Sequence, residues 1–365
     1  MSLSPIWPIV TAWGEGQPPS SQDHQKLIDW ELKHSDRASA WKIDAENVRA
    51  ILANRALVLQ SLHQSLHDSK VTLPLPDSWQ SHTELLWTFW LPFAQQLNAQ
   101  QKALGRPLIQ GILGGQGTGK TTLTQGLSVI LSLMGQSTAQ LSLDDLYFSY
   151  GDRLKLQQSD PRFLWRGPPG THDIELGVRT LNAIKTAAPG SKVSLPQFDK
   201  SLHQGQGDRT SPTLQPAPSI FFFEGWFVGA TPLDDALFAD LRIALPSPIE
   251  TPEDRQFARD MNRQLQQYQP LWAMLDSLVV LLQEDYRLSY DWRLQAEQQM
   301  RAAGKAGLSD EKIASFVTYF WKALHPELFI SPLADSTAKA PSGRRKARLV
   351  VKVGQGHTLR ALYSP

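Results

Sequence analysis

The sequence has no cysteine, no long apolar run and almost no net charge, and each of these excludes a class of function. The absence of cysteine excludes disulfides, thiolate metal sites and cysteine nucleophiles. No apolar run approaches 18 residues, and the start "MSLSPIWPIVTAW" lacks a basic segment followed by an apolar one. The net charge of +1 does not favour a nucleic-acid partner. We therefore expect a soluble cytoplasmic protein with neither a membrane nor a nucleic-acid partner.

What the chain does contain is ample material for a core. Its 365 residues, 41% of them hydrophobic, exceed the size of one typical core, so one large or two unequal domains are expected. Seven of the twelve tryptophans precede residue 91. Their expected role is packing, and a ligand cage is the alternative.

Residues 1–104 are expected to form a helical N-terminal extension. A stripe at helical spacing runs through 43–66 and includes Leu52, Leu59 and Leu66. The segment 73–79 interrupts this pattern, and 82–104 resumes it. No chemical motif lies here, so packing on the second domain is the expected role.

Residues 105–365 alternate between apolar strands and helices, which predicts an α/β fold. Five short runs read as buried parallel strands, and they are 107–113, 137–143, 219–224, 276–282 and 347–353. Between them, residues 150–218 are rich in Gly, Pro, His and Arg, and such a loop-rich segment is usually functional. The basic tract at 343–348 is expected to be a solvated loop, with a nucleic-acid patch as the alternative.

The stretch "GILGGQGTGKTTL" at 111–123 is the most specific motif. It fits G-x-x-x-x-G-K-[ST], the phosphate-binding loop, between a predicted strand and a predicted helix at 120–135. Glycines let backbone N–H groups approach a polyphosphate, and the helix N-terminus adds further donors. Lys120 would contact the β- and γ-phosphates, and the Thr121 hydroxyl would bind Mg²⁺. The residues expected to bind ATP are Gly114, Gly115, Gln116, Gly117, Thr118, Gly119, Lys120, Thr121 and Thr122.

Carboxylates end two of the predicted strands. Asp144 and Asp145 follow one strand, and because ligands bind beyond the carboxyl ends of such strands, both would face the nucleotide. Alternation along the strand should separate their roles, with Asp144 accepting the proton of an attacking hydroxyl. Capping of the next helix is the alternative role. Glu224 ends the run "SIFFFEG" in the manner of a Walker B acid, and we expect it to hold Mg²⁺ with Thr121.

Cations gather in the loop-rich segment and favour an anionic substrate. They are Arg166, His172, Lys200, His203 and Arg209, alongside Asp173, Asp199 and Asp208. Guanidinium groups suit a carboxylate ligand, although each residue alone could equally be a surface charge.

A lid is expected at about 293–310. A predicted helix, a glycine-punctuated loop and a helix capped by Ser309 carry Arg293, Arg301 and Lys305 there. Lids of this kind bring cations to the transferring phosphoryl group, and ordinary surface charge is the alternative.

Together these motifs resemble the P-loop kinases related to uridine kinase, pantothenate kinase and phosphoribulokinase. Closer is the resemblance to D-glycerate 3-kinases of plant and cyanobacterial type. It rests on the phosphate loop, on Ser142-x-Asp144-x-Leu146-Tyr147, and on the runs "RGPPGTHDIEL", "FDKSLHQGQGDR", "FEGWFVG" and "WRLQAEQQMR". Leu146 departs from the phenylalanine that is usual in the family, and the resemblance covers roughly 106–355.

The resemblance implies phosphoryl transfer from ATP to a hydroxyl of D-glycerate, giving 3-phosphoglycerate, with ATP and Mg²⁺ as cofactors. It implies Asp144 as the catalytic base, with Lys120, Glu224 and Arg293 also catalytic. The implied acceptor site contains Asp144, Tyr147, Arg166, His172, Asp173, Lys200 and Arg209. A nucleoside, pantothenate or ribulose 5-phosphate as acceptor remains the alternative, as does a nucleotide-dependent regulatory ATPase.

Overall fold

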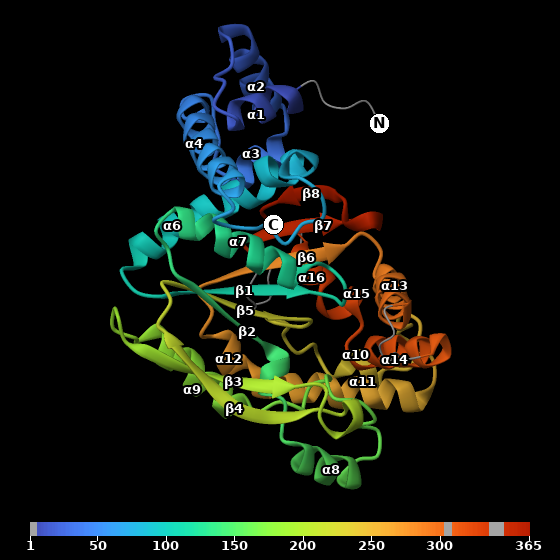
Figure 1. Ribbon diagram of the computed structural model, residues 1–365. Helices are drawn as coiled ribbons and strands as arrows, with labels where there is room; N and C mark the ends of the chain where they lie inside the picture. The colour runs from blue at the N-terminus through green and yellow to red at the C-terminus, as the bar shows by residue number, and fades with distance from the viewer. Residues whose placement is uncertain (1–5, 303–308, 336–346) are drawn as a thin grey trace.

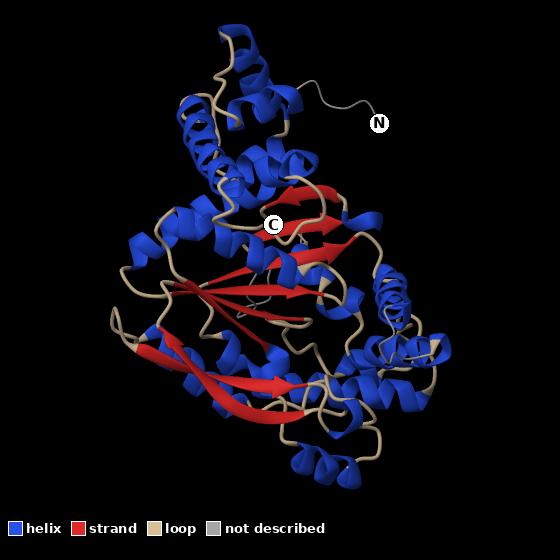
Figure 2. Cartoon of the chain, in the orientation of Figure 1, coloured by secondary structure: helices blue, strands red, loops and turns tan. Residues whose placement is uncertain are grey.

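The computed structural model describes residues 6–302, 309–335 and 347–365. Its centre is a six-stranded sheet in the order β2-β5-β1-β6-β7-β8, parallel except for the antiparallel edge strand β8 (Figures 1 and 2). Its strands are β1 (Leu108–Gly114), β2 (Thr138–Ser142), β5 (Ile220–Gly225), β6 (Ser277–Gln283), β7 (Leu349–Val353) and β8 (Leu359–Tyr363).

The five strands expected from the sequence are confirmed to within two residues, and so is the α/β fold. Strands β1, β5, β6 and β7 read as apolar runs because both faces of the sheet are covered there, whereas the edge strand β2 is mostly polar and only partly buried. Along β1, Leu108 and Ile112 join one core, whereas Ile109 and Leu113 join the other. The edge strand β8 has no such run and was not expected.

Helices from the N-terminal segment pack over one face of the sheet and beyond its β8 edge (Figure 1). They are α1 (Trp7–Gly14), α2 (Ser21–Lys33), α3 (Ser35–Ala40), α4 (Val48–His67), α5 (Thr83–Leu85) and α6 (Leu91–Leu104). In Figure 1, α1–α4 gather beyond the β7–β8 edge, and α6 lies beside α7 (Lys120–Leu133) over the sheet. Trp87 and Trp90 are buried in this layer, where they pack as core residues.

The opposite face carries the remaining layers. They include α8 (Tyr150–Ser159), α9 (Ile174–Lys185), α10 (Ala236–Ala239), α11 (Pro252–Gln264), α12 (Gln269–Trp272), α15 (Pro326–Phe329) and α16 (Ser331–Ala334). The helices α13 (Leu288–Ala302) and α14 (Asp310–Ala323) pack against each other beyond the strand ends. Within the described ranges, no helix is both long and apolar enough to cross a membrane.

The segment 150–218 is more regular than its composition indicates. Besides α8 and α9, it forms the antiparallel hairpin of β3 (Lys192–Asp199) and β4 (Asp208–Pro216), which lies below the main sheet in Figure 2. The residues of β4 are mostly exposed and polar, so no apolar pattern marks it as a strand. Loops remain on both sides of these elements, and they contain most of the expected acceptor residues.

Candidate active site

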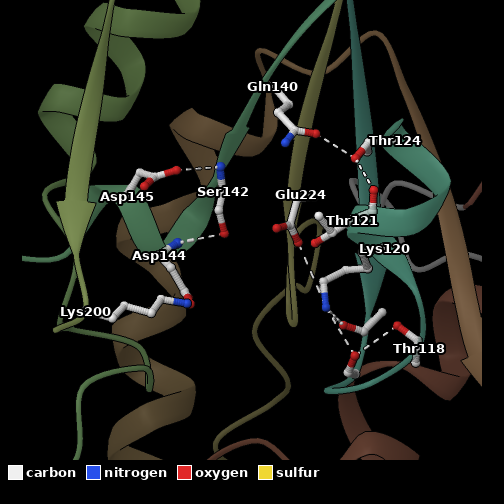
Figure 3. Close-up of polar contacts among 12 residues, drawn as sticks. Thr118, Lys120, Thr121, Thr124, Gln140, Ser142, Asp144, Asp145, Lys200 and Glu224 are labelled. Carbon is white, nitrogen blue, oxygen red and sulfur yellow. Dashed lines mark hydrogen bonds and ion pairs between the residues drawn. The ribbon is translucent and has the colours of Figure 1, made fainter. Parts of the chain in front are cut away.

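Three neighbouring strands bring the predicted nucleotide and acceptor residues to one edge of the sheet. β5 lies between β1 and β2, with Glu224 in register with Ile112 on one side and Ser142 on the other. Because these strands are parallel, their carboxyl ends share that edge. Figure 3 shows Glu224 between the phosphate loop and the turn that carries Asp144.

The loop after β1 has the backbone geometry of a phosphate cradle. Gly117 and Gly119 have φ of +75° and +85°, which glycine adopts at little cost. A Cβ on Gly114 would lie 2.4 Å from Thr118 Oγ1, so a side chain there would displace the turn. Gly119 begins α7 without a side-chain cap, which leaves the first amides of the helix directed at the loop.

The Lys120 side chain is held over this loop by hydrogen bonds to the backbone of the loop. Its Nζ donates to the carbonyl oxygens of Gly114 and Gly115 at 2.9 and 3.1 Å, and lies 3.9 Å from Glu224 Oε2. In Figure 3 the Glu224 carboxylate points toward Lys120 and the Thr121 hydroxyl. The Lys120 ammonium, the Glu224 carboxylate and the Thr121 hydroxyl therefore lie together at the place where the terminal phosphates of a nucleoside triphosphate would bind (Figure 3).

Asp144 and Asp145 have different roles, but not for the reason inferred from the sequence. They lie in the 3-10 turn Leu143–Leu146, so strand alternation does not apply. Asp145 Oδ2 accepts from the backbone N–H of Ser142 at 3.0 Å, and Ser142 Oγ accepts from the Asp144 N–H at 3.3 Å. Asp145 therefore caps this turn, as the alternative interpretation of the sequence predicted. The Asp144 side chain takes no part in the cap and contacts Tyr147 and Lys200.

Asp144 accepts two side-chain hydrogen bonds. Tyr147 Oη donates at 2.8 Å and Lys200 Nζ at 2.6 Å. Burial alone would raise the pKa of Asp144, but the Lys200 charge and these hydrogen bonds outweigh it and lower the pKa below its ordinary value. Burial, together with Asp144, raises the pKa of Tyr147 well above its usual range. Asp144 is therefore ionised at neutral pH, and Tyr147 remains a donor to it.

His172 does not supply the positive charge expected of it. The side chain is 2% exposed, stacks on Tyr147 with ring centroids 4.7 Å apart, and its Nδ1 lies 2.7 Å from Tyr268 Oη. Burial lowers its pKa to about 3, so the imidazole is neutral. His172 is therefore a packed side chain next to Tyr147 and Tyr268. Nothing in the sequence indicated the role of Tyr268.

Arg209 and Asp173 hold the Asp144 turn to the neighbouring elements. Arg209 Nε donates to the Tyr147 carbonyl at 2.7 Å, and its Nη2 donates to Asp173 Oδ2 at 3.1 Å. Asp173 also caps α9 by accepting from the Leu176 N–H at 2.9 Å. Both residues lie near Asp144, and these groups have protein partners. We propose a positioning role for them, in place of the acceptor contact expected from the sequence.

Arg209→Ala should therefore act mainly on stability and turnover. Removing the guanidinium leaves the carbonyl of Tyr147 and the Asp173 carboxylate unpaired, which should lower the free energy of unfolding by about 1–3 kcal/mol. Urea unfolding measures this, with Arg179→Ala on α9 as a control because Arg179 is 64% exposed and pairs only at the surface. A rise in the acceptor KM with unchanged stability would contradict the positioning role.

Arg166 lines a hollow of about 530 Å³ on the acceptor side. Its Nη1 donates to the carbonyl oxygens of Gly205 and Gln206 at 2.8 and 3.0 Å, and its guanidinium lies over Phe198. Arg153 and Glu297 line the same hollow. Its lining combines these charged groups with apolar and aromatic side chains such as Leu164 and Trp165.

The expected lid residues pair with carboxylates. Arg293 Nη2 contacts Glu297 Oε1 within α13, and Arg301 Nη2 lies 2.5 Å from Asp310 Oδ1 of α14. Lys305 lies outside the described residues. Two residues that sequence reasoning missed adjoin the phosphate loop, since His357 Nε2 lies 2.6 Å from the Gly117 carbonyl and stacks on Trp292. No local motif marks His357, because its partner is 240 residues away.

The chain is similar to several proteins in sequence or in structure. The chain is 34% identical over 256 residues to "D-glycerate 3-kinase, chloroplastic" of Arabidopsis thaliana, which covers 67% of this chain and 52% of that protein. It is 35% identical to "Uncharacterized kinase mug58" of Schizosaccharomyces pombe, over 61% of this chain and 82% of that protein. The chain thus spans about half the length of the plant relative and most of the yeast one.

A solved structure agrees with these matches. The "D-glycerate 3-kinase from Cryptococcus neoformans" superposes with a TM-score of 0.63 and 28% identity, over 75% of this chain and 97% of that one. No protein-family model matches the sequence. The phosphate loop, the acidic strand ends and these relatives place the chain in one family, and it belongs to the P-loop kinases that include the D-glycerate 3-kinases and the fission-yeast kinase mug58.

Proposed function

We propose that this protein transfers the γ-phosphoryl group of ATP to a hydroxyl of D-glycerate, giving 3-phosphoglycerate and ADP. The observation that carries the proposal is the placement of Asp144, paired with Lys200, two strands from the phosphate loop on one sheet edge. The names of the plant and Cryptococcus relatives support glycerate as the acceptor.

The residues of the chain divide the chemistry among them. Asp144 takes the proton of the attacking hydroxyl, whose oxygen forms a bond to the γ-phosphorus as the bond to the β–γ bridging oxygen breaks. Lys120 and the loop amides stabilise the charge on the phosphates, and the positioning of the two reactants supplies the rest of the catalysis. Arg293, if released from Glu297, would add a cation at the same place.

Mg²⁺ fits the donors at the loop. Magnesium in kinases is usually held by one or two protein oxygens together with phosphate oxygens and water. Thr121 and Glu224 would provide those oxygens, and Glu224 is 14% exposed with Lys120 as its ion partner. When bound, the metal would neutralise charge on the β- and γ-phosphates. No cluster of three metal-binding side chains occurs among the residues that can be described, so this site would depend on the nucleotide.

Lys200 is the proposed contact for the glycerate carboxylate. Its side chain is 59% exposed and its Nζ already lies on Asp144, beside the position of the acceptor hydroxyl. Transfer of this ammonium to the substrate carboxylate would leave Asp144 available for the hydroxyl proton. Arg166, at the charged hollow, would be a second cation.

Release of ADP with D-glycerate and with glycerol as acceptors tests the function. Glycerol offers hydroxyls without the carboxylate, so we expect glycerate to be preferred by kcat/KM. Lys200→Ala should raise the glycerate KM roughly 10- to 100-fold, as for loss of a charge-assisted hydrogen bond, with little change in the ATP KM. The difference in kcat/KM between glycerate and glycerol should therefore become smaller in this variant.

Lys192→Ala is the matched control, because Lys192 is an exposed lysine at the far end of β3, the strand that Lys200 directly follows. If the Lys200 variant changed the ATP KM as strongly as the glycerate KM, its role would be with the phosphates instead. Faster turnover with uridine, pantothenate or ribulose 5-phosphate would refute glycerate, and ADP release that needs no acceptor would indicate a regulatory ATPase.

A further inference from the structure

A second hollow, of about 650 Å³, is lined in part by the phosphate loop. Its floor is formed by the loop and the first turn of α7, including Thr121 and Thr122. One wall comes from the sheet through Leu281, Val351 and Val353. Another wall comes from the N-terminal segment through Pro74, Leu75, His82 and Leu85, for which packing was the role expected from the sequence.

The N-terminal segment is fixed by close packing against α7, the helix that follows the phosphate loop. A Cβ on Gly126 of α7 would lie 2.0 Å from Trp90 Cζ3, so the indole occupies the space that a side chain would fill. Trp90 is 3% exposed and lies in the core shared by the two segments. The residues 74–90 therefore adjoin the phosphate loop as part of one packed unit.

The chemistry of this hollow differs from that of the hollow on the acceptor side. Among its described lining residues, Lys120 is the sole Lys, Arg, Asp or Glu, and it belongs to the phosphate loop. The acceptor-side hollow contains Arg153, Arg166 and Glu297. A flat apolar group joined to a phosphate chain suits the 650 Å³ hollow, because its only charged lining residue among those described belongs to the phosphate loop.

We infer that the 650 Å³ hollow takes the adenine base of ATP, and that the N-terminal segment forms one side of this base site. The inference rests on the proposed use of ATP. It gives residues 74–90 a function in nucleotide affinity in addition to their packing. Leu75 and Leu85 are partly exposed apolar side chains on that wall, so a base would bury them.

Equilibrium binding of Mg²⁺-ATP and of inorganic tripolyphosphate to the full chain distinguishes the contribution of the base to affinity from that of the phosphates. For Leu75→Ala and Leu85→Ala, we expect the Kd of ATP to rise roughly 5- to 30-fold, the range for losing part of a buried aliphatic side chain. Tripolyphosphate, which has no base, should bind as it does to the unaltered protein. Leu57→Ala is the matched control, since Leu57 lies in the same N-terminal segment, is 60% exposed and does not line this hollow.

Unchanged ATP binding in both variants would overturn the inference. So would equal weakening of ATP and tripolyphosphate, because the leucines would then support the loop and not the base. Glycerate takes no part in this experiment. A failure of the glycerate assignment would therefore appear only in the acceptor assay, whereas a failure of the base site would appear only here.

Discussion

Asp144→Asn is expected to lower kcat roughly 10²- to 10⁴-fold, the usual range for a lost general base, while the Kd of ATP stays near that of the unaltered enzyme. The amide keeps the shape of the side chain but cannot take the hydroxyl proton. Lys200, 2.6 Å away, and Tyr147 keep the native carboxylate ionised by lowering its pKa. Single-turnover measurements at saturating ATP and acceptor would give the chemical step directly.

Asp145→Asn provides the control within the same turn. Asp145 accepts the Ser142 N–H at 3.0 Å, a bond that an asparagine oxygen can also accept, so turnover should change little. Burial raises the pKa of Asp145, which also makes it a poorer candidate for a carboxylate ionised at low pH. Equal losses at both positions would mean that the turn as a whole, and not Asp144, matters for transfer.

Lys120→Ala is expected to lower kcat/KM for ATP roughly 10²- to 10³-fold, the effect of removing one preorganised donor at developing charge. Lys120 Nζ reaches the carbonyls of Gly114 and Gly115, so it lies over the cradle that would hold the β- and γ-phosphates. ADP release at varied ATP concentration measures the loss. Thermal unfolding shows whether the loop change affects the rest of the fold.

The Lys120→Arg variant distinguishes the effect of positive charge at the loop from the effect of the size and shape of the cationic group. The planar guanidinium retains the positive charge but cannot occupy the position of a compact ammonium, so we expect most of the loss to remain. Normal activity in the alanine variant would refute the phosphate-loop assignment. Recovery in the arginine variant would show that charge near the loop is sufficient.

The positions of five strands of the main sheet could be read from the sequence, because most of them are apolar runs bounded by polar residues. The phosphate loop was equally readable, since its glycines and Lys120 are adjacent in the chain and act through local backbone geometry. The hairpin of β3 and β4 could not be predicted from the sequence, because the exposed polar residues of β4 show no alternation of apolar and polar side chains.

The roles of the acceptor residues depended on partners far along the chain. Arg209 and His172 read as cations for an anionic substrate, but Arg209 binds the Tyr147 carbonyl 62 residues away. His172 is neutral because burial beside Tyr268, 96 residues away, lowers its pKa. Residue type indicates which charges a segment can offer, and only packing determines which of them are already paired or desolvated.

The sequence by itself determined the α/β class, the phosphate loop and the carboxylates at the strand ends, because these are local patterns of residue type and spacing. Only the tertiary structure decided that β5 lies between β1 and β2, which places Glu224 between Lys120 and Asp144. It also decided that the N-terminal segment packs, through Trp90 against Gly126, on α7, the helix that follows the phosphate loop. Strand order and the docking of helices arise from contacts between distant residues, which no local pattern records.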